Sequence, residues 1–242
     1  MGVTAQAKPI VFPMILGNNG AGTLDDGTEV IIYPLMGAPD WRNDETLDPD
    51  WNIFSERVPG TFADYVAVPC RNAIPRPSGI SALEASVMGT AWLTAYRMLF
   101  TKSGLKPGQT MLVQGGSGGV ATALIQLGRA AGIEVWATSR TTKGRATWPH
   151  TLESVGRGGV VVTMGITTGN DPSANLMRLF VEQITVSGTI IGTREEMNNL
   201  IQFVIRTGIK PEIGQVLPMD RAEEAIRTMQ EGQTHGKTVF TR

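Results

Sequence analysis

The residues best placed to do chemistry form a glycine cluster, Gly116-Ser-Gly-Gly-Val-Ala121, between a short apolar run and a helix-like segment. The cluster matches G-x-G-x-x-G/A, in which glycines make a tight turn and allow the backbone to approach a pyrophosphate closely. Free N–H groups at the start of the following helix would bind the phosphates. A glycine-rich turn without a ligand is the alternative. We expect the cofactor-binding residues of this turn to be Gly116, Ser117, Gly118, Gly119 and Val120.

The residues after the second strand indicate which dinucleotide is bound. An acidic residue about 20 positions after the glycines usually binds the ribose 2′-hydroxyl of NAD. The corresponding stretch, Trp136-Ala-Thr-Ser-Arg140, holds no acid. A hydroxyl and a guanidinium there suit the extra phosphate of NADPH. We therefore predict NADPH, read by Ser139 and Arg140 with Lys143 as a helper; Arg140 as a plain surface residue is the alternative.

The elements around the glycine cluster must hold it in place. Apolar runs at 110–114 and 133–138 flank a helical pattern at 118–131, which predicts a β–α–β unit and a parallel sheet. Capping-box patterns at Ser81/Glu84, Thr193/Glu196 and Asp220/Glu223 predict helix starts. The further predicted helices are 81–103, 148–155, 175–182, 193–207 and 222–230, and the further predicted strands are 30–33, 65–68, 160–164, 184–190 and 237–241.

A polar loop at 40–57 carries six acidic residues and two arginines. Acidic residues without ligand spacing are typical of a solvated loop rather than of a metal site. We expect Trp41 and Trp51 to pin this loop rather than to bind a partner.

Composition bounds the function classes. The 242 residues include 21 basic and 22 acidic side chains, so no broad positive field is available for nucleic acid or a membrane surface. The single cysteine, Cys70, excludes an internal disulfide. No stretch of eighteen apolar residues occurs, and the first residues lack the apolar core of a signal peptide. We expect a cytoplasmic α/β protein without nucleic-acid or membrane partners.

Several stretches of this chain, and the order in which they follow one another, resemble the medium-chain dehydrogenase/reductase superfamily, in its zinc-independent quinone oxidoreductase-like branch. They begin with Met14-Ile-Leu-Gly17, the stretch 60–69 and Leu93-Thr-Ala-Tyr-Arg97, and they continue through 111–121, 177–180, 192–196 and 236–239. The resemblance implies an α/β fold with two domains, both incomplete here. A GroES-like β-barrel domain would comprise 1–93 with 193–242, and a Rossmann-type parallel-sheet domain would comprise 94–192.

The resemblance also implies the site. It places Asn18 and Asn19 at the floor of a cleft, with Asn19 as the candidate catalytic contact and Tyr65 as a weaker one. Thr94 would flank the nicotinamide. The cofactor would also meet two stretches that follow strands at the carboxyl edge of the sheet, Gly165-Ile166-Thr167 and Ile191-Gly192-Thr193.

Zinc-dependent relatives carry histidine in a Gly-His-Glu phrase, where this chain reads Gly17-Asn18-Asn19-Gly20. His150 and His235 lack a ligand partner at usable spacing, so we predict no zinc. The implied activity is hydride transfer from NADPH to a quinone or an α,β-unsaturated carbonyl, with solvent supplying the proton. A catalytically impaired nucleotide-binding relative and a zinc-type alcohol dehydrogenase are the alternatives. The strand at 184–190 would join two copies as a homodimer.

One departure from the superfamily matters physically. After the strand ending at Thr138, about a β–α–β unit and a helix are missing, so strands three and four of the sheet are absent. In the order 3-2-1-4-5-6 this leaves strand one beside a gap. Unpaired backbone groups there would cost about 1–3 kcal/mol each if buried. Strand 160–164 could move to pair with strand 110–114, a second protomer could fill the slot, or residues could be missing near 139–148.

Overall fold

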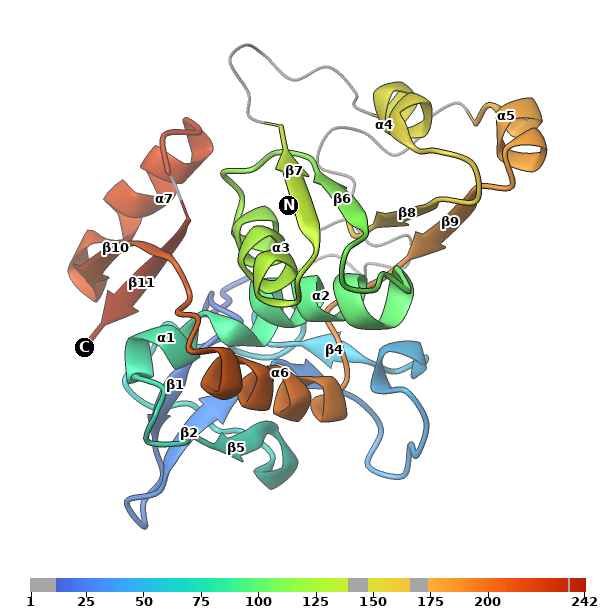
Figure 1. Cartoon of the computed structure of the whole chain (residues 1–242). Coiled ribbons are helices and arrows are strands. Elements are labelled where there is room, and N and C mark those ends of the chain that lie inside the picture. Colours follow the sequence, from blue (N-terminus) through green and yellow to red (C-terminus); the bar gives the residue numbers. More distant parts are fainter. Residues whose placement is uncertain (1–11, 139–147, 166–173, 235) are drawn as a thin grey trace.

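The structure is a computed structural model that describes residues 12–138, 148–165, 174–234 and 236–242. Short antiparallel strands lie at one end of the molecule and helices cross the middle; two parallel strand pairs lie toward the other end, and a third pair, near the C-terminus, lies to one side (Figure 1). The buried core lies where the central helices meet the antiparallel strands.

The antiparallel part is built from short strands of the N-terminal half. β1 (Ala21–Thr23), β2 (Glu29–Ile32) and β5 (Ala73–Pro75) form one sheet in the order β1-β2-β5. β3 (Leu35–Met36) pairs with β4 (Asn52–Ile53), and single 3-10 turns, η1 (Glu45–Leu47) and η2 (Cys70–Asn72), lie in the connections.

The strand predicted near 30–33 is confirmed as β2, but the strand predicted at 65–68 is wrong, because that stretch is a loop. The backbone of residues 60–62 already pairs with residues 15–17, and Tyr65, which follows, is 93% exposed.

One continuous helical segment runs from Ala82 to Lys102 through the centre of the fold. Its α-turns, α1 (Ala82–Ser86) and α2 (Leu93–Tyr96), alternate with wider π-turns, η3 (Met88–Trp92) and η4 (Arg97–Lys102). The predicted capping box at its start is confirmed, since Ser81 and Glu84 bond to each other's backbone N–H groups. Turns of the π type often mark functional sites in helices.

The predicted β–α–β unit is present. β6 (Thr110–Val113) and β7 (Glu134–Ala137) pair in parallel, with Leu112 opposite Trp136, and α3 (Gly119–Ala130) connects them. α3 packs against α2, and Leu127 of α3 is fully buried. The glycine cluster therefore lies where expected, between a parallel strand and the first turn of a helix.

The second half of the parallel part is separate from the first. α4 (Trp148–Ser154) precedes β8 (Val160–Thr163), and α5 (Leu176–Val181) precedes β9 (Thr185–Gly188). β8 pairs with β9 in parallel, and within the described residues neither strand pairs with β6 or β7. The predicted gap in the sheet is thus confirmed, and the proposed move of strand 160–164 onto strand 110–114 is wrong.

The cost predicted for the gap is avoided because the free edge of β6 is not fully buried. Leu112 in the middle of β6 is 43% exposed, so this strand is not enclosed as the interior strand of a complete sheet would be. The alternative that residues are missing near 139–148 stays a prediction, because residues 139–147 lie outside the described residues.

The C-terminal region begins with α6 (Arg194–Thr207), whose predicted capping box at Thr193 and Glu196 is confirmed. β10 (Ile213–Pro218), which the sequence analysis missed, pairs in parallel with β11 (Lys237–Thr241). Between them lie η5 (Met219–Arg221) and α7 (Ala222–Gln230). The capping box predicted at Asp220 is wrong, because Asp220 lies inside η5 and Arg221 occupies the cap position of α7 without a side-chain bond.

Within the part of the chain that the structure describes, no helix is long and apolar enough to cross a bilayer.

Candidate functional site

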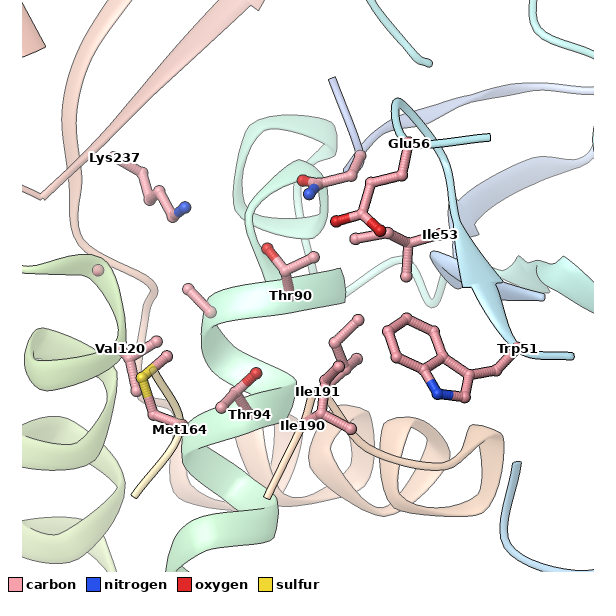
Figure 2. Close-up of a pocket in the computed structure, with 13 residues that line it drawn as sticks. Trp51, Ile53, Glu56, Thr90, Thr94, Val120, Met164, Ile190, Ile191 and Lys237 are labelled. Carbon is pink, nitrogen blue, oxygen red and sulfur yellow. The ribbon is translucent and has the colours of Figure 1, made fainter. Parts of the chain in front are cut away.

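A cavity of about 320 Å³, here called the central cleft, lies along the helix that carries Thr90 and Thr94. Its walls come from segments far apart in the sequence. Lys237 and Val120 lie at one end, Trp51, Ile53 and Glu56 at the other, and Thr90 and Thr94 between them (Figure 2). A ligand in the cleft would therefore touch both the antiparallel part and the parallel part of the fold.

The glycine turn forms one end of this region. Gly118 precedes α3 with ordinary extended backbone angles, and no side chain caps the helix. The first N–H groups of α3 consequently have no partner within the described chain, as expected at a helix start. These N–H groups and the positive end of the helix dipole suit phosphate oxygens.

Glycine at position 118 is not explained by protein packing. A Cβ atom there would lie 3.6 Å from the nearest atom, the carbonyl oxygen of Gly115, which is an ordinary contact. The backbone conformation at position 118, with a φ of −77°, is also one that any residue can adopt. The space that a side chain would fill is therefore free for a group that approaches the backbone closely, as a pyrophosphate does.

Lys237, the first residue of β11, lies beside this turn. A Cβ atom on Gly119 would be 2.7 Å from Cε of Lys237, so a larger residue there would force the end of the lysine side chain to shift. The Gly236 N–H donates to the Ser117 carbonyl at 3.4 Å and holds the strand against the turn. Burial lowers the pKa of the Lys237 amine. Among the described residues Lys237 has no ion-pair partner, so it offers an unneutralised positive charge to an anion.

Two neighbouring amides stand where zinc-dependent relatives carry histidine. The Asn19 side-chain amide donates to Asn18 Oδ1 at 3.2 Å and to Thr90 Oγ1 at 2.8 Å. Asn18 and Thr90 line the central cleft, whereas Asn19 lies behind them with its own Oδ1 buried and unpaired within the described chain. Among the described residues the Asn18 NH2 group makes no hydrogen bond, so it is available as a donor at the cleft. Amide and hydroxyl groups of this kind are poor zinc ligands.

The far end of the central cleft comes from the loop at 40–57. Trp51, Ile53 and Glu56 line it, and burial raises the pKa of the Glu56 carboxyl against the opposing charge of Arg57. The prediction that both tryptophans pin the loop holds for Trp41, whose indole donates to the Asp44 carbonyl at 2.9 Å. Trp51 instead faces the cleft (Figure 2).

A buried ion-pair network anchors the same loop. Arg97, only 2% exposed, donates to Asp44 Oδ2 at 2.5 Å and to Glu196 Oε2 at 2.7 Å. Glu196 also accepts the Thr101 hydroxyl, and Asp48 of the loop is buried and bonded to backbone N–H groups. The prediction of a solvated loop is therefore wrong for Asp44 and Asp48, because both carboxylates make structural contacts.

The backbone beside the central cleft is strained at Ile191. Ile191 lines the cleft with a φ of 40°, a region that a β-branched residue seldom adopts. Backbone strain of this kind clusters at functional sites.

The structure brings together only part of the predicted site. Asn18, Thr94, Gly119, Val120 and Ile191 line the central cleft, with Gly116, Ser117 and Gly118 in the adjoining turn. Ser139, Arg140, Lys143, Ile166 and Thr167 lie outside the described residues.

Four other predicted residues lie elsewhere. Tyr65 is not brought to the cleft, and Gly165 is exposed while its neighbour Met164 lines the wall. The Gly192 carbonyl accepts the Tyr33 hydroxyl at 2.8 Å, and Thr193 caps α6, so both have structural roles.

Lys237, Trp51 and Glu56 line the cleft, although they were not among the site residues predicted from the sequence. Lys237 had one signal, since it belongs to a stretch, 236–239, that carries the family resemblance. In the part of the chain that the structure describes, no group of three histidine, cysteine or acidic side chains could hold a metal ion.

Comparisons with known proteins agree with this arrangement. A family model described as "Zinc-binding dehydrogenase" matches residues 129–240. The zinc-type alcohol dehydrogenase-like protein YogA of Leptosphaeria maculans is 26% identical over 275 aligned positions, covering 88% of this chain and 75% of the relative. Human quinone oxidoreductase is 31% identical over 91 residues, which cover 38% of this chain and 28% of that protein.

Solved structures show the same fold. An NAD-dependent alcohol dehydrogenase superposes with a TM-score of 0.89 at 24% identity, covering 96% of this chain and 84% of the other. The 2-octenoyl-CoA carboxylase reductase CinF, in complex with NADP and 2-octenoyl-CoA, superposes with a TM-score of 0.87 at 20% identity, covering 94% and 68%. These superpositions establish the fold class, which combines a Rossmann-type parallel α/β part with a GroES-like part.

The alignment with YogA also bears on the split sheet. It spans 275 positions although the chain has 242 residues, so the relative carries residues without a counterpart here. The matched sequences include a zinc-type alcohol dehydrogenase-like protein and a quinone oxidoreductase, and the family model covers residues 129–240 of this chain.

Proposed function

We propose that this protein is an oxidoreductase that transfers hydride from NADPH to a quinone or an α,β-unsaturated carbonyl without zinc. The observation that carries the proposal is the geometry of the central cleft. One end offers an uncapped helix start and the Lys237 amine, while the other end offers an apolar and aromatic wall. Such a cleft suits a phosphorylated cofactor that meets a flat, uncharged acceptor.

The residues present fit the cofactor at its phosphate end. The open space at Gly118, the free N–H groups of the first turn of α3 and the charge of Lys237 together favour a pyrophosphate. Thr90 and Thr94 would then lie along the ring of the nicotinamide, and Ile191 would cover it from the other wall. NADPH rather than NADH follows from Arg140 and Ser139, which stay sequence predictions.

The chemistry divides between cofactor and protein. When bound, the nicotinamide supplies the hydride, and the protein orients the two partners and excludes water. The Asn18 NH2 group donates to the carbonyl oxygen of the acceptor and stabilises the negative charge that develops there. Asn19 holds the Asn18 side chain through the hydrogen bond that its amide donates to Asn18 Oδ1.

The proposal is tested by two measurements on the purified chain. NADPH binding is followed by fluorescence titration, and NADPH oxidation is followed at 340 nm with a simple quinone and a simple enone. Turnover that follows saturable binding is the expected result. Binding without oxidation of either acceptor would instead support the impaired nucleotide-binding relative.

A test of zinc dependence distinguishes the proposed function from the remaining alternative, a zinc-type alcohol dehydrogenase. Treatment with a strong zinc chelator should leave the rate unchanged, because the stretch 17–20 carries Asn18 and Asn19 and no histidine. Stoichiometric zinc in the purified protein, together with loss of activity on chelation, would support a zinc-type alcohol dehydrogenase.

We also propose the domain bounds given above and a homodimer. β9 has a free edge within the described residues, and exposed edges favour strand pairing. Val186 on this strand is 41% exposed. A dimer by light scattering that becomes a monomer in Val186→Lys supports this interface; a monomeric wild type rejects it.

A further inference from the structure

Glu56 enters the central cleft from a tight turn. Its carboxylate points into the cleft above Ile53, on the opposite side from Lys237 (Figure 2). The preceding residue, Ser55, has a φ of 71°, which is uncommon for a residue with a side chain. The Ser55 N–H donates to the Val58 carbonyl at 2.9 Å and closes the turn. The backbone is therefore strained at Ser55 in the conformation that directs the Glu56 side chain toward the cleft.

The carboxylate has no bonding partner of its own. Among the described residues no hydrogen bond or ion pair reaches it, although other acids of the loop, such as Asp44 and Asp48, are fully engaged. The charged groups that face it are Arg57 on the same turn, which is exposed, and Lys237 across the cleft. The other residues that line the cleft are uncharged.

The environment favours the protonated acid. Burial raises the pKa of the Glu56 carboxyl, and the apolar wall of Trp51 and Ile53 contributes to that burial. The side chain is nevertheless only half-buried, so bulk water can return a proton to it. A half-buried, solvent-connected carboxyl that lines a cleft and has a raised pKa is suited to act as a general acid.

We propose that Glu56 is the acid that protonates the reduced acceptor, an inference that rests on the proposed function. For an enone, the hydride forms a C–H bond at Cβ, and the electrons of the C=C bond move through Cα to the carbonyl oxygen. The O–H bond of Glu56 then breaks as a C–H bond forms at Cα. Glu56 is left as a carboxylate and regains its proton from water, so the protein returns to its starting state.

The test uses the full chain with NADPH and 2-methylcyclohex-2-enone, whose α-carbon becomes a stereocentre on reduction. We compare wild type, Glu56→Gln and Glu56→Asp, with Glu231→Gln as a control carboxamide on an exposed position. We expect Glu56→Gln to lower kcat by about 100-fold, as loss of a general acid does, with unchanged NADPH affinity. The wild type should give one stereoisomer at Cα, and Glu56→Gln should give a mixture.

The pH profile provides a second readout. Wild-type kcat should fall at high pH as Glu56 loses its proton, and the Gln variant should lack this limb. Glu56→Asp should recover part of the rate, with the limb moved to lower pH because Asp is the stronger acid. If Glu56→Gln keeps the wild-type rate, the fall of kcat at high pH and the wild-type stereochemistry, this inference is wrong while the proposed function stands. A wild type that binds NADPH but reduces no acceptor overturns the proposed function and, with it, this inference.

Discussion

Lys237 passes over Gly119 so closely that a Cβ atom on the glycine would lie 2.7 Å from Cε of the lysine. The two residues are more than a hundred positions apart in the sequence, one at the start of α3 and the other at the start of β11. Their contact brings a half-buried lysine to the N-terminus of a helix, and both features favour an anionic ligand.

This contact predicts different outcomes at two adjacent glycines. Gly118→Ala should cost at most about 1 kcal/mol of stability, the difference between helix caps, yet weaken NADPH binding at least ~tenfold by filling the space left for the pyrophosphate. Gly119→Ala should weaken binding by displacing Lys237. Thermal unfolding and fluorescence titration measure both effects, with Gly79→Ala, in open space, as the control. Unchanged affinity in Gly118→Ala would place the pyrophosphate elsewhere.

Lys237→Met should raise stability and lower affinity. Burial lowers the pKa of Lys237, so between its folded and unfolded pKa values the unfolded chain binds more protons and stability rises with pH. Methionine removes this penalty, so the free energy of unfolding at neutral pH should increase and its rise with pH should flatten. Loss of a charge-assisted contact of about 1.5–3 kcal/mol should weaken NADPH binding roughly 10- to 100-fold.

Urea unfolding at several pH values and NADPH titration check both effects. Lys210→Met is the matched control, because Lys210 is 81% exposed and makes only a distant ion pair at 3.8 Å with Glu84. The interpretation fails if Lys237→Met binds NADPH as tightly as the wild type.

Arg97→Ala should destabilise the protein strongly. Removing Arg97 leaves Glu196 buried beside Thr101 without its counter-ion, and a broken buried pair costs about 3–5 kcal/mol. Arg227→Ala removes an exposed pair with Glu223 on α7 and should cost less than about 1 kcal/mol. Equal losses in denaturant unfolding would show that the buried network contributes no more than a surface pair.

Arg140→Ala tests cofactor choice. If Arg140 binds the 2′-phosphate, the variant should lose about 10- to 100-fold in NADPH affinity, the value of a charge-assisted contact of about 1.5–3 kcal/mol. NADH affinity should change less than about threefold, since NADH lacks that phosphate. Parallel titrations with both cofactors measure the difference, and equal losses for both would reject Arg140 as the discriminating residue.

Local sequence patterns predicted most of the elements. The β–α–β unit at 110–137, the helix over 82–102 and the capping boxes at Ser81 and Thr193 depend on side chains near in sequence, so short-range chemistry was sufficient. The strand at 65–68 was mispredicted because an apolar alternation forms a strand only where a partner strand is available.

The sequence by itself determined the glycine turn, its place between strand and helix, and the pair of amides, Asn18 and Asn19, in the stretch 17–20 that lacks histidine. Only the tertiary structure decided that Lys237, Glu56 and Trp51 line the same central cleft, and that β6 and β8 stay apart. The reason is that turns and caps are set by neighbours a few residues away. The shape of a cleft and the order of strands depend on packing between segments that are far apart in the chain. No short stretch of sequence shows which of these segments will meet.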